Sequence, residues 1–271
     1  MRQVDVKEFR TLRTGRAFEE IEAQIRTKLT DGSLSVGSRL PSERALSEQL
    51  GVSRNTLREA LRSLEKAGLI RLQKGATGGA FINEGSDVAI ASGLLDMYHL
   101  GTIDPLQLTE ARIWIEAIVV RIACERATED DITLLNNNIE DAEAAAQKRD
   151  FELRANKNIE FHRILGQMTR NPIMIVIMNS VLDVLKHFVS EIGRQENNFV
   201  LPSRRRFMKH FIAKNYDAAV SEMESCLRRL QRNYLSRVDS ARLSSLHDGT
   251  PHAVAMAQPT KTRTRLLPDT E

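Results

Sequence analysis

Two arginines that stand four residues apart, Arg54 and Arg58, have side chains suited to reading DNA bases. Residues i and i+4 of a helix lie on the same face, so both guanidinium groups can reach one groove. An arginine near the start of such a helix can donate two hydrogen bonds to O6 and N7 of guanine. The pair therefore predicts a base-reading surface on the helix that carries it.

Polar residues nearby suit the DNA backbone. Asn55 and Thr56 can contact a base edge or a phosphate, and Arg44 on the preceding helix can hold the backbone, which sets register without reading sequence. Lys74 and Gly75 open a glycine-rich tip, where a missing side chain permits close approach to a phosphate. We expect these two residues to reach the minor groove or its phosphates.

Turn and cap residues predict the elements that position these side chains. Ser42 and Ser53 are favourable N-caps for two short helices, the second of which ends near Lys66. Apolar residues recur at helical spacing in the second helix, and we expect them to be buried: Leu57, Ala60, Leu61 and Leu64. A preceding helix is predicted over residues 16–30, and two strands over residues 69–73 and 80–83 are predicted to flank a tip at 75–79.

The rest of the chain has only helical periodicity. Helices are predicted over residues 87–100, 105–127, 129–148, 150–168, 172–192, 202–214 and 216–238, several of them begun by a capping residue and a proline. The predicted fold is mainly α: an N-terminal winged helix-turn-helix of three helices and a two-stranded wing, then an all-α helical bundle. The predicted organisation is a flexible arm (1–15), a DNA-binding domain (16–83), a linker (84–87), a helical domain (88–238) and a disordered tail (239–271).

Composition bounds the function. The chain has 271 residues and a formal net charge of only +3, so any nucleic-acid surface must be local. Residues 39–74 supply it with eight basic residues against four acidic ones, although such a mixture also suits a solvated helix surface. The two cysteines do not indicate a disulfide scaffold, and no secretory signal or apolar run long enough to span a bilayer is evident. We therefore predict a soluble, cytoplasmic protein.

The segment LPSER, followed by ALSEQLGVSRNTLREALRSLEKAGLI and a glycine-tipped strand pair, resembles the winged helix-turn-helix of the GntR regulators. The resemblance covers residues 18–82 almost without gaps. It implies double-stranded DNA as a partner, and it places eight residues at DNA-contacting positions: Arg44, Ser53, Arg54, Asn55, Thr56, Arg58, Lys74 and Gly75.

The C-terminal part resembles the FadR-like branch of that family, which has an FCD effector domain. The residues that carry the resemblance are Glu110-Ala111-Arg112 with Glu116, then Asn158-Ile159-Glu160-Phe161-His162 and Asn171-Pro172. Many members of this branch hold a divalent metal with one Asp and three His. The resemblance places these four positions at Asn158, His162, Arg204 and Cys226.

Three of these four positions depart from the family's ligands. Arginine stays protonated and is not a metal ligand, and a neutral asparagine oxygen is a weak one. We therefore predict no metal and no other cofactor, with a divalent metal in the helical domain as the alternative. A slip in the alignment, which would bring His187 or His210 into the set, is the main route to that alternative.

Without a metal, arginines can hold an anionic effector, because a planar guanidinium suits bidentate capture of a carboxylate. The predicted effector-binding residues are Arg112, Asn158, His162, Arg204 and Cys226. Other interpretations stay open for three of them. Arg112 could simply pair with Glu116, Arg204 could be solvated within its run of three arginines, and His162 could be a core histidine.

The predicted function is a transcriptional repressor that binds a pseudo-palindromic operator as a homodimer and responds to an organic acid or acyl thioester. The alternatives are an activator or dual regulator of the same family, or an architectural DNA binder without effector. We predict no enzymatic activity, because neither a nucleophile–base constellation nor a phosphate-binding glycine loop is evident. Trp114 and Met223 are expected to be packing residues.

Overall fold

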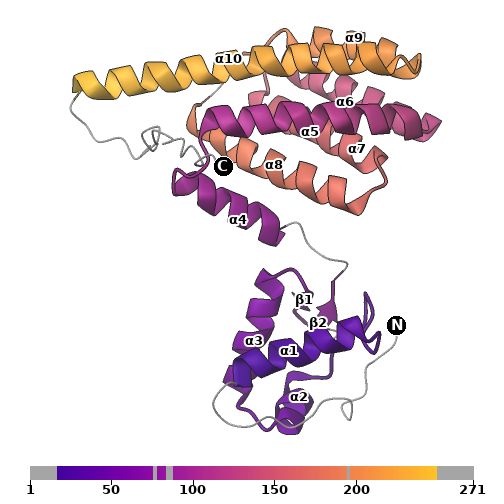
Figure 1. The fold of residues 1–271 in the computed structure, drawn as a ribbon, viewed down its shortest axis with the longest axis vertical. Coiled ribbons are helices and arrows are strands. Elements are labelled where there is room, and N and C mark those ends of the chain that lie inside the picture. The colour runs from indigo at the N-terminus through magenta and orange to yellow at the C-terminus, as the bar shows by residue number, and fades with distance from the viewer. Residues whose placement is uncertain (1–16, 76–77, 84–87, 194–195, 249–271) are drawn as a thin grey trace, which may run out of the picture. The chain divides into compact units, whose positions relative to one another are not determined.

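The computed structural model describes residues 17–75, 78–83, 88–193 and 196–248 (Figure 1). The chain divides into two compact units, Met1–Ile90 and Ala91–Glu271. The described residues are mainly helical with one two-stranded antiparallel sheet, so the predicted fold class is confirmed. The predicted arm (1–15) and linker (84–87) lie outside the described residues.

The N-terminal unit contains three helices and a hairpin: α1 (Ala17–Thr30), α2 (Glu43–Leu50), α3 (Arg54–Lys66), β1 (Ile70–Gln73) and β2 (Gly79–Ile82). Both predicted N-caps form, since the Ser42 side chain accepts from the Ala45 N–H and the Ser53 side chain accepts from the Thr56 N–H. The tight turn between α2 and α3 depends on Gly51, whose φ of 67° closes α2 in the left-handed conformation.

The predicted apolar stripe of α3 forms the centre of this unit. Leu57, Ala60, Leu61 and Leu64 are all buried, and they pack in one core with Ile21 and Ile25 of α1. Burial of each large aliphatic side chain contributes about 1.5–3 kcal/mol, which fixes which face of α3 turns inward. The opposite face of α3 is thereby left in solvent.

The hairpin that follows α3 pairs residue Ile70 with Ile82 and residue Gln73 with Gly79. An isolated bridge joins Arg39 to Phe81, and the Arg39 guanidinium donates to the carbonyl oxygen of Gly78 and lies 5.8 Å from the centre of the Phe81 ring. Arg39, a residue before α2, therefore anchors the wing to the helices.

The second unit contains seven helices among the described residues: α4 (Val88–His99), α5 (Pro105–Arg126), α6 (Glu129–Gln147), α7 (Phe151–Met168), α8 (Pro172–Glu191), α9 (Val200–Ile212) and α10 (Tyr216–Asp248). In the unit's core, α5 packs against α7, α8 and α10, while α6 packs against α7 and α9 (Figure 1). Four phenylalanines are almost completely buried in this core: Phe161, Phe188, Phe207 and Phe211.

Three predicted helix boundaries were wrong by two residues or more, and one of them is the end of α9, at Ile212 rather than at residue 214. Helix α9 begins at Val200 rather than at residue 202, so Pro202 lies within the first turn, where its missing N–H has no helical partner to lose. Helix α10 continues to Asp248, ten residues past the predicted end, and so residues 239–248 do not belong to a disordered tail. No glycine or proline interrupts the sequence before Gly249, and the polar residues there were wrongly interpreted as irregular.

One helix corrects the prediction that no segment could span a bilayer. By length and composition alone α8 is apolar enough to do so. Its apolar residues, however, include Met178, Leu182, Leu185 and Phe188, which are buried in the core of the helical unit. The composition of α8 is therefore that of a central core helix.

Candidate functional site

The exposed face of α3 presents the two arginines that the sequence singled out. The side chains of Arg54 and Arg58 are 59% and 50% exposed, and both turn toward Glu43 at the start of α2. The Arg58 Nε donates to Glu43 Oε2 at 2.7 Å, whereas the nearest nitrogen of Arg54 lies 4.0 Å away. Asn55 beside them is exposed as well. The two guanidinium groups are thus brought together on one accessible surface.

Glu43 is a residue that the sequence analysis did not select. Its carboxylate holds Arg58, so any other acceptor must compete with it for the guanidinium. The pair is solvent-exposed, so its contribution to stability is small and its exchange for another acceptor costs little. The spacing alone gave no signal for this contact, because Glu43 and Arg58 stand on different helices.

The remaining predicted DNA-contacting residues near α3 have structural partners. The Ser53 and Thr56 hydroxyl oxygens are 2.9 Å apart and serve the start of α3, and Arg44 pairs with Glu48 one turn along α2 at 2.9 Å. The hydroxyl of Ser53 thus has a capping role whether or not it also contacts DNA. Arg44 stays 79% exposed and is accessible to a phosphate.

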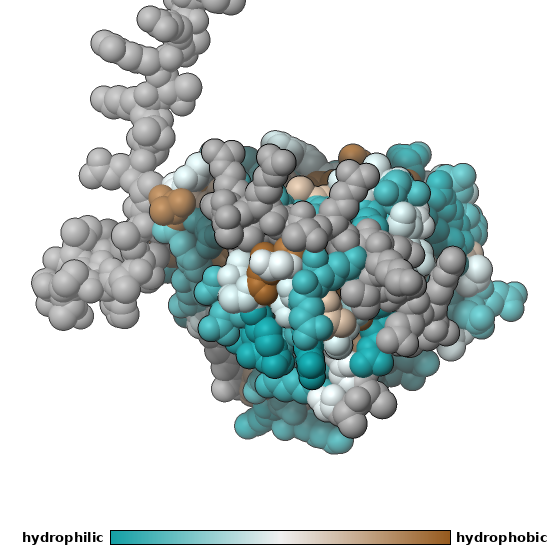
Figure 2. Space-filling model, turned by 90° about the horizontal axis from the view of Figure 1, so that it is seen from below, coloured by the Kyte–Doolittle hydropathy of each residue, from teal (hydrophilic) through white to brown (hydrophobic). Residues whose placement is uncertain are grey.

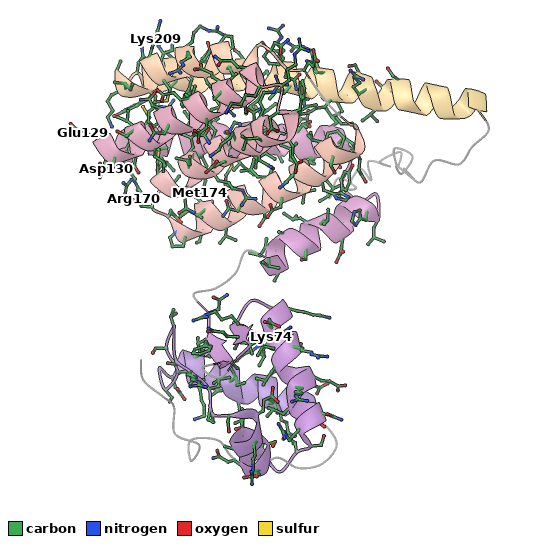
Figure 3. The ribbon with its side chains drawn as sticks, turned by 180° about the vertical axis from the view of Figure 1, so that it is seen from behind. Lys74, Glu129, Asp130, Arg170, Met174 and Lys209 are labelled. Carbon is green, nitrogen blue, oxygen red and sulfur yellow. The ribbon has the colours of Figure 1, made fainter. Side chains whose placement is uncertain are left out.

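The wing places Lys74 and Gly75 in solvent directly after β1 (Figure 3). Gly75 has a φ of 107°, a conformation that side chains other than glycine rarely adopt. Where Figure 2 is coloured, most of the surface is hydrophilic, with smaller apolar areas between the hydrophilic residues. These features suit a surface that contacts a charged, hydrated partner.

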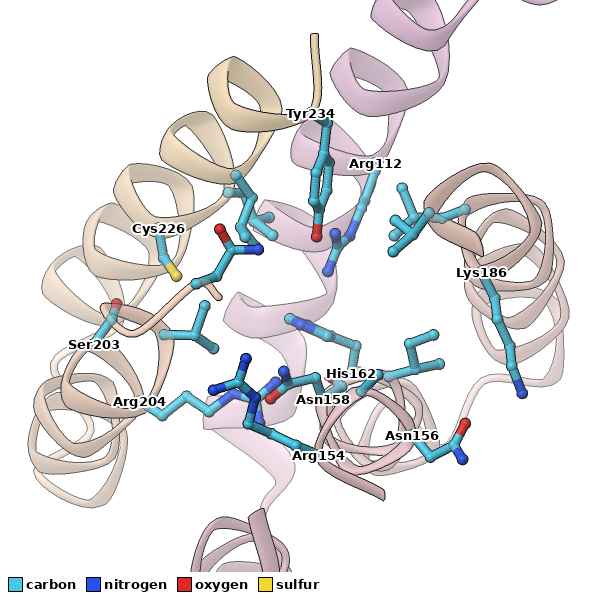
Figure 4. A pocket seen from close by; sticks show the side chains of 18 of the residues that line it. Arg112, Arg154, Asn156, Asn158, His162, Lys186, Ser203, Arg204, Cys226 and Tyr234 are labelled. Carbon is cyan, nitrogen blue, oxygen red and sulfur yellow. Dashed lines mark hydrogen bonds between the residues drawn. The ribbon is translucent and has the colours of Figure 1, made fainter. Parts of the chain in front are cut away.

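A cavity of about 480 Å³ lies inside the helical unit, among α5, α7, α8, α9 and α10. All five residues that were predicted to bind an effector line it (Figure 4): Arg112, Asn158, His162, Arg204 and Cys226. Most of its other lining is apolar and comes from residues such as Leu185, Val189 and Leu230. A largely apolar cavity with a few convergent polar groups is typical of a small-molecule site.

The charged floor of the cavity is built around Glu116, whose side chain is completely buried. The Arg112 Nε donates to Glu116 Oε2 at 3.3 Å, and His162 Nδ1 contacts the other carboxylate oxygen. Arg112 therefore fits both interpretations given for it, because it pairs with Glu116 and also lines the cavity.

The protonation states in this cluster follow from burial and from the neighbouring charges. Burial alone would raise the pKa of Glu116, but His162 and Arg112 together hold it below its ordinary value, so Glu116 is a carboxylate. Burial lowers the pKa of His162 to about 4 against the opposing effect of Glu116, so this imidazole is neutral at pH 7. A carboxylate can only accept, so His162 Nδ1 carries the proton and Nε2 is left as an acceptor.

Arg204 extends into the same cavity from α9 (Figure 4). It is only 4% exposed, its guanidinium carbon lies 4.2 Å from the centre of the Phe161 ring, and its Nη2 donates to the carbonyl oxygen of Asn158 at 2.8 Å. The interpretation of Arg204 as a solvated member of an arginine run is wrong. Its neighbours Arg205 and Arg206 pair with glutamates instead.

Two buried polar atoms at this point have no hydrogen-bond partner among the described residues: Arg204 Nη1, a donor, and Asn158 Oδ1, an acceptor. Buried polar groups are nearly always satisfied, and an unsatisfied one costs about 1–3 kcal/mol. Burial lowers the pKa of Arg204 to about 10, so it remains charged at neutral pH. The cavity therefore offers an unmet charged donor beside an unmet acceptor.

The donor set does not fit the divalent metal that the family resemblance implies. The guanidinium of Arg204 is a cation, and burial raises the pKa of the Cys226 thiol, which keeps it protonated. His162 Nδ1 carries a proton and contacts Glu116, so this nitrogen cannot be a metal ligand. His187, a candidate under a shifted alignment, lies instead beside His99, with their Nε2 atoms 2.9 Å apart.

Several polar residues that line the cavity were not selected from the sequence, and Tyr234 is the one buried beside Arg112. Tyr234 of α10 lies near Arg112 in Figure 4, and burial raises the pKa of its hydroxyl. Its position at helical spacing from Leu227 and Leu230 gave only a packing signal. Met223 is buried as expected, whereas Trp114 on α5 is 61% exposed and is not a core residue.

Comparisons with known proteins identify both units. Residues 17–82 match the family described as "Bacterial regulatory proteins, gntR family", and residues 107–229 match the FCD domain. The "Putative L-lactate dehydrogenase operon regulatory protein" of Escherichia coli is 31% identical over 191 residues, which cover 69% of this chain and 71% of that protein.

Two further comparisons agree. The "HTH-type transcriptional repressor NanR" of Salmonella arizonae is 31% identical over 172 residues, or 62% of this chain and 63% of its own length. Among solved structures, "Streptococcus agalactiae GntR" superposes with a TM-score of 0.59 and 25% identity, and the alignment covers 79% of this chain and 99% of that one.

Proposed function

Because this chain belongs to the GntR family of bacterial regulatory proteins and has an FCD domain, we propose that it is a cytoplasmic repressor whose operator binding is controlled by a small anionic metabolite. The families and relatives that it matches are transcription regulators rather than enzymes. A repressor is favoured over an activator because a relative is named as one. The effector is an organic acid or an acyl thioester bound in the cavity of the helical unit.

The observation that carries the DNA-binding part of the proposal is the pair of exposed arginines on α3. Arg54 and Arg58 are one turn apart, and among the described residues their acidic partner is the half-buried Glu43. Helix α3 enters the major groove, the two guanidinium groups read guanine edges, and Arg44, Ser53, Asn55, Thr56, Lys74 and Gly75 contact bases or the backbone.

The homodimer follows from the symmetry of a pseudo-palindromic operator, in which each half-site takes one recognition helix. Exposed apolar side chains on α5 support it. Trp114 and Ile118 are 61% and 54% exposed and stand one helical turn apart, so a second copy of the chain would cover both.

The effector part rests on the buried cations of the cavity. Arg112 and Arg204 line it together, and Asn158, His162 and Cys226 supply polar contacts around them. A guanidinium with an unmet donor in a mainly apolar cavity selects an anion, since no other ligand class would satisfy its charge.

A binding experiment on selected DNA tests the proposal. Operator sequences are selected from a random pool with the full-length protein, and the affinities for the selected duplex and for random duplex are compared by fluorescence anisotropy. We expect Arg58→Ala to weaken operator binding by about 1–3 kcal/mol and to relax selectivity at one base pair. Lys66→Ala, an exposed basic residue in the last turn of α3, is the matched control and should have little effect.

Two results would contradict the proposal. Equal affinity for selected and random duplex would instead indicate an architectural DNA binder. A protein that binds its operator more tightly in the presence of every anion that occupies the cavity would act in the opposite sense to the one proposed.

A further inference from the structure

We propose that the cavity of the helical unit binds a 2-hydroxy monocarboxylate with an apolar body, directly and without a metal ion. Its carboxylate lies on Arg204 and Arg112, and its hydroxyl donates a hydrogen bond to Asn158 Oδ1. This inference rests on the proposed function in one respect, namely that the cavity is an effector site. It then names the chemical class of that effector.

The charge of the cavity sets the number of carboxylates. The buried ionisable residues that line it are Arg112, His162, Arg204 and Tyr234, whose hydroxyl is neutral, and Glu116 lies against the first two. Two guanidinium charges face one carboxylate, and the imidazole is neutral at pH 7, so the buried set has one net positive charge. A single carboxylate neutralises this buried set, and Glu152, Arg154 and Lys186, which also line the cavity but are half-buried or exposed, lie away from it.

The position of the positive charge is equally specific. Glu116 accepts from Arg112 and contacts His162, whereas buried Arg204 has no ion pair among the residues that the structure describes. Its unpartnered Nη1 is the donor that a carboxylate oxygen would accept from. In Figure 4 the side chains of Arg204 and Asn158 lie at the wall of the cavity and point toward each other.

The acceptors beside that donor require a second group on the ligand. Asn158 Oδ1 is buried without a partner, and the tautomer that Glu116 imposes on His162 leaves Nε2 as a further acceptor. A carboxylate has no proton to give to either atom. A hydroxyl next to the carboxylate supplies one, and if the Asn158 amide is turned over, its NH2 group can donate to the same hydroxyl oxygen.

The same argument distinguishes a hydroxyl from an ammonium group. A 2-amino acid also offers donors, but it is a zwitterion, and its binding would leave the net positive charge of the cavity uncompensated. A divalent cation would add two more positive charges beside Arg204. Both are therefore excluded by charge rather than by shape.

The rest of the lining defines the body of the ligand. Beyond the charged end, the wall consists largely of apolar side chains: Phe151, Ile159, Leu185, Val189, Val200, Phe207, Met223, Leu227 and Leu230. A cavity of about 480 Å³ is larger than a two- or three-carbon acid fills. We therefore expect a branched aliphatic or aromatic body to bind more tightly than a methyl group.

Calorimetry with matched acids on the full-length protein tests this inference. Two series share a body and differ only at carbon 2: 3-phenyllactate, 3-phenylpropanoate and phenylalanine, and 2-hydroxy-4-methylpentanoate, 4-methylpentanoate and leucine. We expect the hydroxy acid in at least one series to bind at least about tenfold more tightly than its deoxy analogue, and the amino acid to bind most weakly. The hydroxy acid's affinity should be the same with EDTA and with added Mn²⁺ or Zn²⁺.

Two variants at one position sharpen the test. Asn158→Ala removes the acceptor, so the preference for hydroxy over deoxy acid should shrink to about unity while the deoxy acid binds as before. Asn158→Asp adds a negative charge that cancels the net positive charge of the buried residues. In the presence of EDTA, the hydroxy acid and the deoxy acid should therefore bind this variant more weakly than the unchanged protein, and the amino acid should bind it more tightly. Circular dichroism and thermal melting establish that both variants are folded.

The outcomes separate this inference from the proposed function. Equal binding of hydroxy and deoxy acids, tighter binding of the amino acid, or a strict need for metal would overturn the inference but leave an effector site in place. Failure of all six probes would also overturn it. If malonate, glutarate and an acyl thioester then failed too, the proposed anionic effector would be wrong as well.

Discussion

At the residue scale, the clearest lesson concerns the run Arg204-Arg205-Arg206. Three identical side chains stand side by side in the sequence, yet Arg204 is buried over Phe161 while Arg205 and Arg206 pair with Glu143 and Glu222 at or near the surface. Helical geometry points successive residues about 100° apart, so only one of the three faces the core. The sequence suggested an inward Arg204 but did not determine it, since that depends on which helix covers α9.

Burial of His162 has a consequence for stability that pH can reveal. Its pKa is about 4 in the folded chain against an ordinary value of 6.5, so the unfolded chain binds the proton first as pH falls. The free energy of unfolding should therefore decrease between pH 6.5 and pH 4, by about 3 kcal/mol at most, and this contribution is fully present only above pH 6.5. Glu116, whose pKa is lowered, acts in the same direction at the acid end.

Denaturant unfolding at a series of pH values measures this effect. His162→Gln keeps a donor for Glu116 but does not titrate, so the slope between pH 6.5 and pH 4.5 should become flatter. His210→Gln, a half-buried histidine outside the cavity, is the control. If the free energy of unfolding of His162→Gln changes with pH as steeply as that of the unchanged protein, the imidazole of His162 is not the cause of the pH dependence.

Arg112 provides a second prediction at this scale. Arg112→Ala removes one of two cations of the cavity and should weaken binding of any cognate anion by at least about tenfold, as measured by calorimetry. Because Glu116 then loses its partner, the variant should also be less stable by about 3 kcal/mol. Arg112→Lys separates the loss of anion affinity from the loss of stability. It keeps the positive charge beside Glu116 but loses the paired N–H donors of the guanidinium. Unchanged anion affinity in Arg112→Ala would remove this residue from the site.

At the element scale, capping residues predicted helix starts better than composition predicted helix ends. Ser42, Ser53, Asp104, Thr128 and Asn171 all cap helices through their side chains. These contacts are local and depend on residues within three positions, so the sequence specifies them. The end of α10 and the start of α9 have no such local signal, and both were misplaced.

The cap of α2 offers a test of how firmly the DNA-reading surface is positioned. Ser42→Ala removes the acceptor for the Ala45 N–H and should destabilise the protein by about 1 kcal/mol in chemical denaturation. It should also weaken operator binding, because Glu43 and Arg44 belong to the same first turn. Ser42→Asp, which restores an acceptor, should regain most of the stability, and a failure to do so would show that the cap is not the cause.

At the scale of the whole molecule, the sequence revealed two units with different tasks because each has its own local signature. The helix-turn-helix spacing lies within residues 42–66, whereas the cavity assembles Arg112, Asn158, Arg204 and Tyr234 from four helices. Sequence spacing alone could not bring those four together. The family resemblance supplied the first three and Glu116 as a partner of Arg112, whereas Tyr234 gained its place in the site only from the fold.

The proposed function requires that the chain couples an anion site in the helical unit to DNA reading by α3. Coupling between two sites is reciprocal: an effector that weakens operator binding by some factor must itself bind operator-bound protein more weakly by the same factor. That factor is typically about 5–150 for allosteric proteins.

The most direct test is a titration of the full-length protein with its best-binding hydroxy acid, with and without saturating selected operator, paired with operator titrations with and without the acid. We predict that the acid's Kd rises in the presence of operator by the factor by which the acid raises the operator's Kd. Identical Kd values of the acid for free and operator-bound protein would contradict the account.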